Sequence, residues 1–268
     1  YRTPIMIRNN IKVVGYENKL KIYKNGNVIS REIGNIGTNI DTTDIIVDLT
    51  IDENNHIYVV GEKFAEQEIF LNKYDDNGNE LWIWRNKQIQ APRKVIVDTQ
   101  NNVYVLSHEW NRTNNSHWDL AILKFSPGQF LWKRNIYTTV GTDSYRWEYG
   151  TDMIVQGDFL YLTAMVWFGN ISASTQLVVN GYNSQMNTTL PTRLQEEGGI
   201  LCKCTLEAEI VHATPLSFMS GPNTISYYIV PSALTIYNGS IYFAARKADK
   251  ASIGKIDLNL RTNARYMD

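Results

Sequence analysis

The sequence predicts an all-β chain of the β-propeller class, with five four-stranded antiparallel blades around a central channel. Short apolar runs alternate with turns rich in Asn, Asp and Gly, which is typical of antiparallel meanders. Aromatic residues make up 12% of the chain, with 16 Tyr and 7 Trp, and they suit pleated, half-buried surfaces. The meander recurs with a period of about 46–52 residues, and stacked repeats of this kind bury sheet faces that one repeat alone leaves exposed.

The second unit shows the pattern most clearly. An apolar run at 48–51 is followed by a polar turn at 52–55 and a return at 56–61, and a second hairpin joins 69–74 to 80–84 through a turn at 75–79. The first unit has candidate strands at 4–7, 11–16, 20–23 and 28–33, with tight turns at Asn9-Asn10 and around Asn25-Gly26. We expect residues 4–7 to belong to this first blade, without strand exchange between the chain ends.

The later units follow the same order. The third has strands at 95–97, 103–107, 120–125 and 129–132, and the fourth at 151–155, 159–166, 200–205 and 209–214. The fifth has strands at 233–237, 240–245, 253–258 and 262–267, with an Asn238-Gly239 hairpin. We expect one domain, 1–268, with blades near 2–35, 42–86, 92–138, 148–216 and 225–268, and a loop insertion at 168–199.

Matched positions support the repeat. Gly15 and Gly61 lie 46 residues apart, and Trp82 and Trp132 close two matched turns. The alignment places Val59, Val105, Leu162 and Phe243 at equivalent second-strand positions, and we expect all four to be buried between blades.

Composition excludes several classes. The 26 Lys and Arg nearly balance the 27 Asp and Glu, which gives no support for nucleic-acid binding. No apolar run approaches the roughly 20 residues of a transmembrane segment. Because the chain opens on Tyr1 rather than Met, we expect a mature or excised product that has lost a targeting segment.

The repeats resemble a known family. An Asp, a turn with an Asn pair and then (Ile/Val)-Tyr-Val occur at 52–59 and at 98–105, and Leu-Asn-Lys-Tyr-Asp occurs at 71–75. These motifs are similar to the SBBP propeller repeats of bacteria and archaea, which are related to NHL and PQQ-like propellers. The resemblance covers about residues 44–135 well and implies a secreted or surface-anchored, non-catalytic module. It carries over no ligand and no cofactor.

Five Asn-x-Ser/Thr sequons fit an extracellular chain and predict glycosylation. They are at Asn111, Asn114, Asn170, Asn187 and Asn238. Asn238 is the weakest candidate because it lies in a tight turn.

We expect no catalytic residue and no metal. Cys202 and Cys204 are interpreted as packing residues, and 75–80 as a turn rather than a calcium loop. An alternative remains open, in which Asp44, Glu148 and Asp152, near the starts of inner strands, serve as glycosidase carboxylates.

Four tryptophans do not follow the repeat and flank predicted loops, where aromatic rings can stack on sugars or anchor a protein interface. They are Trp110, Trp118, Trp147 and Trp167. We therefore expect an adhesive or structural module on a prokaryotic cell surface, with a protein, a glycan or further copies of itself as partner. A lectin or glycoside hydrolase on the same fold is the alternative.

Overall fold

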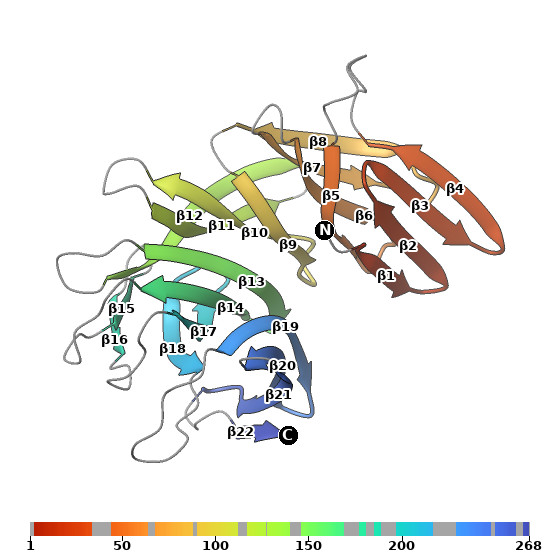
Figure 1. Ribbon diagram of the computed structural model, residues 1–268. Helices are drawn as coiled ribbons and strands as arrows, with labels where there is room; N and C mark the ends of the chain where they lie inside the picture. Colours follow the sequence, from red (N-terminus) through yellow and green to blue (C-terminus); the bar gives the residue numbers. More distant parts are fainter. Residues whose placement is uncertain are drawn as a thin grey trace. The chain divides into compact units, whose positions relative to one another are not determined.

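The computed structural model describes residues 3–33, 44–63, 68–87, 90–111, 117–126, 128–139, 146–168, 177–180, 185–188, 197–216, 229–247, 250–260 and 265–267. These residues form strands and turns and contain no helix (Figure 1). The chain divides into two compact units, Tyr1–Glu109 with Leu123–Lys133, and Trp110–Ile122 with Arg134–Asp268.

The first two sheets are regular four-stranded meanders, and both lie in the first compact unit, Tyr1–Glu109 with Leu123–Lys133. The first sheet contains β1 (Ile5–Arg8), β2 (Ile11–Tyr16), β3 (Lys19–Lys24) and β4 (Asn27–Glu32). The second contains β5 (Asp44–Ile51), β6 (Ile57–Lys63), β7 (Glu68–Tyr74) and β8 (Glu80–Asn86). Since β1 pairs with β2, the expectation that the N-terminal strand belongs to the first blade is confirmed.

The third and fourth sheets are continuous with each other. The third contains β9 (Gln90–Val97), β10 (Val103–Asn111), β11 (His117–Ser126) and β12 (Gln129–Thr139), and the fourth contains β13 (Arg146–Gln156), β14 (Phe159–Phe168), β17 (Glu197–Thr205) and β18 (Ile210–Leu216). A single parallel pair joins β11 to β13. The fifth sheet contains β19 (Ile229–Tyr237), β20 (Ser240–Lys247), β21 (Lys250–Asp257) and β22 (Arg265–Met267). The predicted set of five four-stranded antiparallel blades is confirmed.

The insertion differs from the loop that the sequence predicts. It contains a hairpin of β15 (Leu177–Asn180) and β16 (Gln185–Thr188), and β15 pairs with β12 through Tyr137–Asn180, Thr138–Val179 and Thr139–Val178. The third sheet is therefore extended past its outer strand. The prediction of one polar loop at 168–199 overlooks the short apolar run at 177–179, which forms a strand.

Tight turns form where the sequence places Asn pairs and Asn-Gly. Asn9 and Asn10 have φ of 46° and 64°, Asn25 and Gly26 have 51° and 78°, and Asn238 and Gly239 have 46° and 70°. Positive φ at both central positions is the requirement of a type I′ turn, and Asn and Gly meet it at the lowest steric cost.

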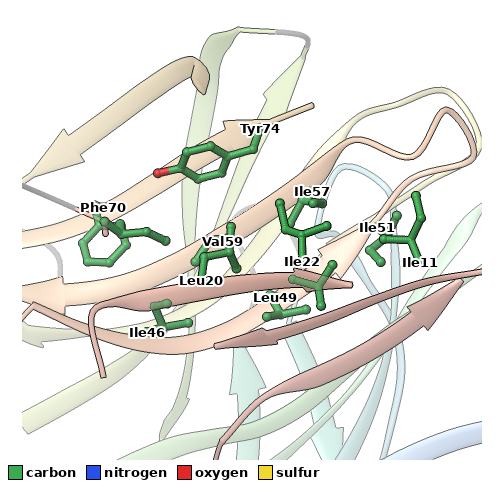
Figure 2. Packing of buried hydrophobic residues seen from close by; sticks show 12 residues of the cluster. Ile11, Leu20, Ile22, Ile46, Leu49, Ile51, Ile57, Val59, Phe70 and Tyr74 are labelled. Carbon is green, nitrogen blue, oxygen red and sulfur yellow. The ribbon is translucent and has the colours of Figure 1, made fainter. Parts of the chain in front are cut away.

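Apolar clusters lie between successive sheets. Between the first and second sheets, Ile11, Val13, Leu20 and Ile22 pack against residues of the second sheet that include Val59 and Phe70 (Figure 2). A second cluster joins the second sheet to the third, and a third cluster joins the fourth to the fifth. The expectation that Val59, Val105, Leu162 and Phe243 are buried is confirmed, since each is at most 1% exposed.

The alignment of Gly15 with Gly61 is wrong by one residue. Val13 and Val59 lie in the same cluster, so the Val13 side of the first sheet faces the second sheet while the Val59 side of the second faces the first. If Val13 and Val59 were equivalent, both would face the preceding sheet or both would face the next one. The two-residue turn at Asn9-Asn10 is shorter than the turn before Ile57, and this difference shifts the register of β2 by one position.

Candidate functional site

Three of the four selected tryptophans lie on adjacent strands of the second compact unit, Trp110–Ile122 with Arg134–Asp268. The backbone register pairs Trp118 of β11 with Trp147 of β13, and Trp147 with Trp167 of β14. We call Trp118, Trp147 and Trp167 the tryptophan row. Each lies near a strand end rather than in a loop, and Trp118 is half-buried. Trp110 lies near the end of β10.

The row continues onto a fourth strand, because Trp167 pairs with Glu197 of β17. Neighbouring strands in a sheet lie about 4.8 Å apart, so the three tryptophan backbones span a width comparable to a short oligosaccharide or a peptide strand. The side chains of Trp110, Trp147 and Trp167 are outside the described residues.

The sequons fall in different settings. Asn238 is exposed at the β19–β20 turn. Asn111 ends β10 and Asn187 lies in β16, although their side chains are outside the described residues, as are Asn114 and Asn170 altogether.

Asp152 has a structural role in the joint between the fourth and fifth sheets. It lies beside a β-bulge in β13, is 7% exposed, and its Oδ2 accepts a hydrogen bond from the Leu234 N–H of β19 at 2.6 Å. A carboxylate held by a backbone donor in this way is engaged in the fold rather than placed for proton transfer. The side chains of Asp44 and Glu148 are outside the described residues.

Asp48 repeats this arrangement between the second and third sheets. It also lies beside a bulge, in β5, and its Oδ2 accepts the Val95 N–H of β9 at 2.9 Å. Lys94 Nζ lies 3.7 Å from the same oxygen. Sequence reasoning missed Asp48, although its position matches Asp152 within the repeat. We call these two contacts the aspartate tethers.

The repeated Asp of the first turn is structural as well. Asp52 Oδ1 accepts the N–H groups of Asn54 and His56 at 2.9 and 2.8 Å, and Tyr58 Oη donates to Oδ2 at 3.1 Å. Asp98 is bonded in the same way, with Tyr104 Oη donating to Oδ2 at 3.2 Å. The Asp and Tyr of the repeat motif are therefore two ends of one buried hydrogen-bond network.

This network shifts the titration of its members. Burial disfavours the Asp52 carboxylate, but hydrogen bonds and the charge of His56, with the Tyr58 hydroxyl, outweigh burial and lower its pKa. Burial, with the nearby Asp52 charge, raises the pKa of Tyr58. Burial alone raises the pKa of the Cys202 thiol to about 12, so this cysteine is an unreactive packing residue.

Tyrosine and lysine form a recurrent cross-strand pair. The Lys73, Lys124, Lys203 and Lys255 ammonium groups lie 5.1–5.6 Å from the ring centroids of Tyr58, Tyr104, Tyr161 and Tyr242 respectively. In the fourth sheet, Tyr161 Oη and Lys203 Nζ both donate to the Leu258 carbonyl of the fifth, at 3.1 and 3.3 Å. The pair thus links one sheet to the next.

The two carboxylates of the turn at 75–79 are bonded to groups of the protein. Asp75 Oδ1 accepts the N–H groups of Asn77 and Asn79, and Asp76 pairs with Lys24 Nζ at 2.6 Å. Within the described ranges, no group of three or more His, Cys, Asp or Glu could hold a metal ion. The interpretation of 75–79 as a turn is supported by these contacts.

Comparison with known proteins finds likeness in structure only. No family model matches the chain. No curated protein matches it either. Among solved structures, the extracellular domains 1–2 of Drosophila Semaphorin 1a have a TM-score of 0.54 at 9% identity, covering 96% of this chain and 52% of that one.

Two enzymes are similar in fold. An ulvan lyase, a polysaccharide lyase, has a TM-score of 0.52 at 10% identity, covering 98% of this chain and 70% of that one. A Synechocystis apocarotenoid oxygenase mutant has a TM-score of 0.50 at 10% identity, covering 100% and 59%. The fold is a β-propeller. The chain spans little more than half the length of the semaphorin and oxygenase chains.

Among the described residues, no helix is long and apolar enough to cross a bilayer.

The Asp52 network makes a pH-dependent prediction. Asp52→Asn should cost about 1–3 kcal/mol at neutral pH, because it removes a charged acceptor from a buried network. The folded-state pKa of Asp52 is lowered, so its contribution is present above the unfolded value, near pH 4, and is lost as pH falls through the folded value. Urea unfolding at pH 7 and pH 3 should show the penalty shrinking in acid.

Glu53→Gln is the matched control, because the Glu53 side chain is 65% exposed and its loss should change stability by less than about 0.5 kcal/mol. An Asp52→Asn penalty of equal size at both pH values would contradict the assigned role of the carboxylate.

Proposed function

We propose that this chain is a non-catalytic interaction module, secreted or displayed on a prokaryotic cell surface, that adheres to a protein or glycan partner through the tryptophan row. The observation that carries the proposal is the register that aligns Trp118, Trp147 and Trp167 on three adjacent strands. Tryptophan is enriched at binding hot spots, where a large apolar ring is combined with one hydrogen-bond donor.

The settings of the carboxylates support binding over catalysis. Asp152, the one member of the possible glycosidase set whose side chain is described, accepts a backbone N–H at the joint between two sheets. Asp48, Asp52 and Asp98 are also bonded to N–H groups of the fold. A general acid or base needs a carboxyl group that faces substrate, and these four face the backbone.

Three further observations support an extracellular setting. The repeats resemble the SBBP propellers, the sequence has five sequons, and the matched semaphorin region is described as extracellular domains. The semaphorin likeness also agrees with a role in binding proteins, since Drosophila Plexin A in complex with Semaphorin 1b, at 7% identity, has a TM-score of 0.54.

Cell adhesion tests the tryptophan row. Labelled protein should bind intact cells of its native source, and replacing Trp118, Trp147 and Trp167 together by Ala should weaken binding about tenfold or more. Leu131→Ala, at a side chain that is 45% exposed on β12, is the control for loss of exposed apolar surface. Equal binding by wild type and the triple variant, both folded, would refute the proposed contact. Competition by free glycans would separate a sugar ligand from a protein.

Native protein tests the compartment. Intact-mass and peptide analysis of material from the source cell should show hexose-containing mass at one or more of Asn111, Asn114, Asn170 and Asn187, because exposed sequons of surface proteins are glycan acceptors. Unmodified peptides at all four sites would remove the main sequence support for surface display.

A further inference from the structure

The tryptophan row ends on an acidic residue. In the backbone register, Trp118 pairs with Trp147, and Trp147 pairs with Trp167. Trp167 in turn pairs with Glu197 of β17. All four residues belong to the second compact unit. Because residues directly opposite one another on neighbouring strands share a face of the sheet, the register assigns three tryptophans and one glutamate to a single row.

The next row on the same face carries no charge. Two residues along the strands, Tyr149 pairs with Met165, and Met165 pairs with Gly199. Among the registered residues of β13, β14 and β17 in these two rows, Glu197 is the only one that is charged at neutral pH. The sign of the charge at the row is therefore negative.

The charged neighbours of Trp147 along β13 do not change this result. Arg146 and Glu148 lie on either side of Trp147 and pair with Phe168 and Val166. Successive residues of a strand alternate between the two faces of a sheet, so the register assigns both to the opposite face. Their charges are also of opposite sign and balance each other.

A cation already packs on aromatic rings in the same sheet. Lys203 Nζ lies 4.1 Å from the ring centroid of Phe159 and 5.6 Å from that of Tyr161, and the lysine is 8% exposed. Tryptophan attracts a cation over its ring face more strongly than phenylalanine or tyrosine does. Three tryptophans beside one carboxylate thus match the chemistry of a positively charged ligand.

We propose that the tryptophan row recognises organic cations, and that its ligand is a segment of a protein partner carrying Lys or Arg side chains. This inference rests on the proposed function, because it takes the row as the contact surface and assigns the chemistry of what the row binds. An ammonium or guanidinium group gains from the electron-rich ring faces, and the Glu197 carboxylate adds a charge-assisted hydrogen bond. A neutral sugar can stack on the rings but gains nothing from the charge.

The width of the row favours a protein segment over a single cationic headgroup. Since neighbouring strands lie about 4.8 Å apart, the four strands of the row span about 14 Å. One ammonium group covers one ring, whereas a peptide segment can place several cationic side chains along such a row. The partner surface is therefore expected to be basic.

Fluorescence anisotropy with a labelled peptide rich in Arg and Lys tests the ligand chemistry. Wild type should bind this peptide and should not bind a peptide of the same length with Gln at each basic position. Glu197→Gln should weaken binding about tenfold, because the amide keeps the shape of the side chain and loses its charge. Glu209→Gln, the same change at an exposed residue between β17 and β18, should bind like wild type.

Trp167→Leu separates cation recognition from charge attraction alone. Leucine keeps apolar bulk but has no aromatic face, so binding of the basic peptide should again fall about tenfold. Wild-type affinity in either Glu197→Gln or Trp167→Leu, with thermal unfolding showing an intact fold, would overturn the proposal. Tighter binding to phosphocholine vesicles than to the peptide would assign the cation to a lipid and overturn the protein source.

Cell adhesion distinguishes failure of this inference from failure of the proposed function. An excess of the basic peptide should block adhesion, and Glu197→Gln should weaken it. Adhesion that is lost in the triple tryptophan variant, yet unaffected by the peptide and by Glu197→Gln, would overturn the cationic ligand and leave the row as the contact surface. Adhesion that the triple variant retains in full would overturn both.

Discussion

Neighbouring sheets in this chain bury apolar faces against one another, and this burial is the interaction on which the rest of the structure depends. A four-stranded meander must cover its apolar face to be stable in water, and here a neighbouring sheet supplies the cover. The three described clusters satisfy this requirement with interleaved aliphatic and aromatic side chains. The chain therefore repeats one unit five times.

Apolar packing holds neighbouring sheets together but does not fix their alignment, since aliphatic surfaces can slide over one another. Buried polar contacts supply the register. The aspartate tethers fix the inner strands of two joints, and the pair Tyr161 and Lys203 fixes a turn of the fifth sheet. Each donor or acceptor would be left buried and unsatisfied if the sheets shifted, and that cost makes the observed alignment specific.

The sequence predicted the elements well because strands and tight turns are local. Asn-Gly and Asn-Asn pairs mark positions where φ is positive, and alternating apolar residues mark strands. Predictions that depend on contacts between distant residues were weaker. The register of Gly15 against Gly61 failed by one position because the turns before β2 and β6 differ in length. The β15–β16 hairpin was missed because its partner strand is distant in sequence.

In the candidate site, too, local features could be predicted from the sequence and contacts between distant residues could not. The four tryptophans could be selected because they depart from the repeat, but only the pairing of strands shows that three of them lie in one row. Asp152 was selected, with Asp44 and Glu148, as a possible glycosidase carboxylate because a carboxylate near the start of an inner strand is all that the sequence shows. Its partner Leu234 is 82 residues away, so the structural role could not be predicted.

Amide hydrogen exchange tests the tethering of the sheets most directly. Asp48→Ala should accelerate exchange of the Val95 N–H by about tenfold or more and leave Leu234 unchanged, and Asp152→Ala should do the reverse. Each variant thereby serves as the control for the other. Unchanged exchange at Val95 and Leu234 in both variants would contradict the claim that these carboxylates hold adjacent sheets in register.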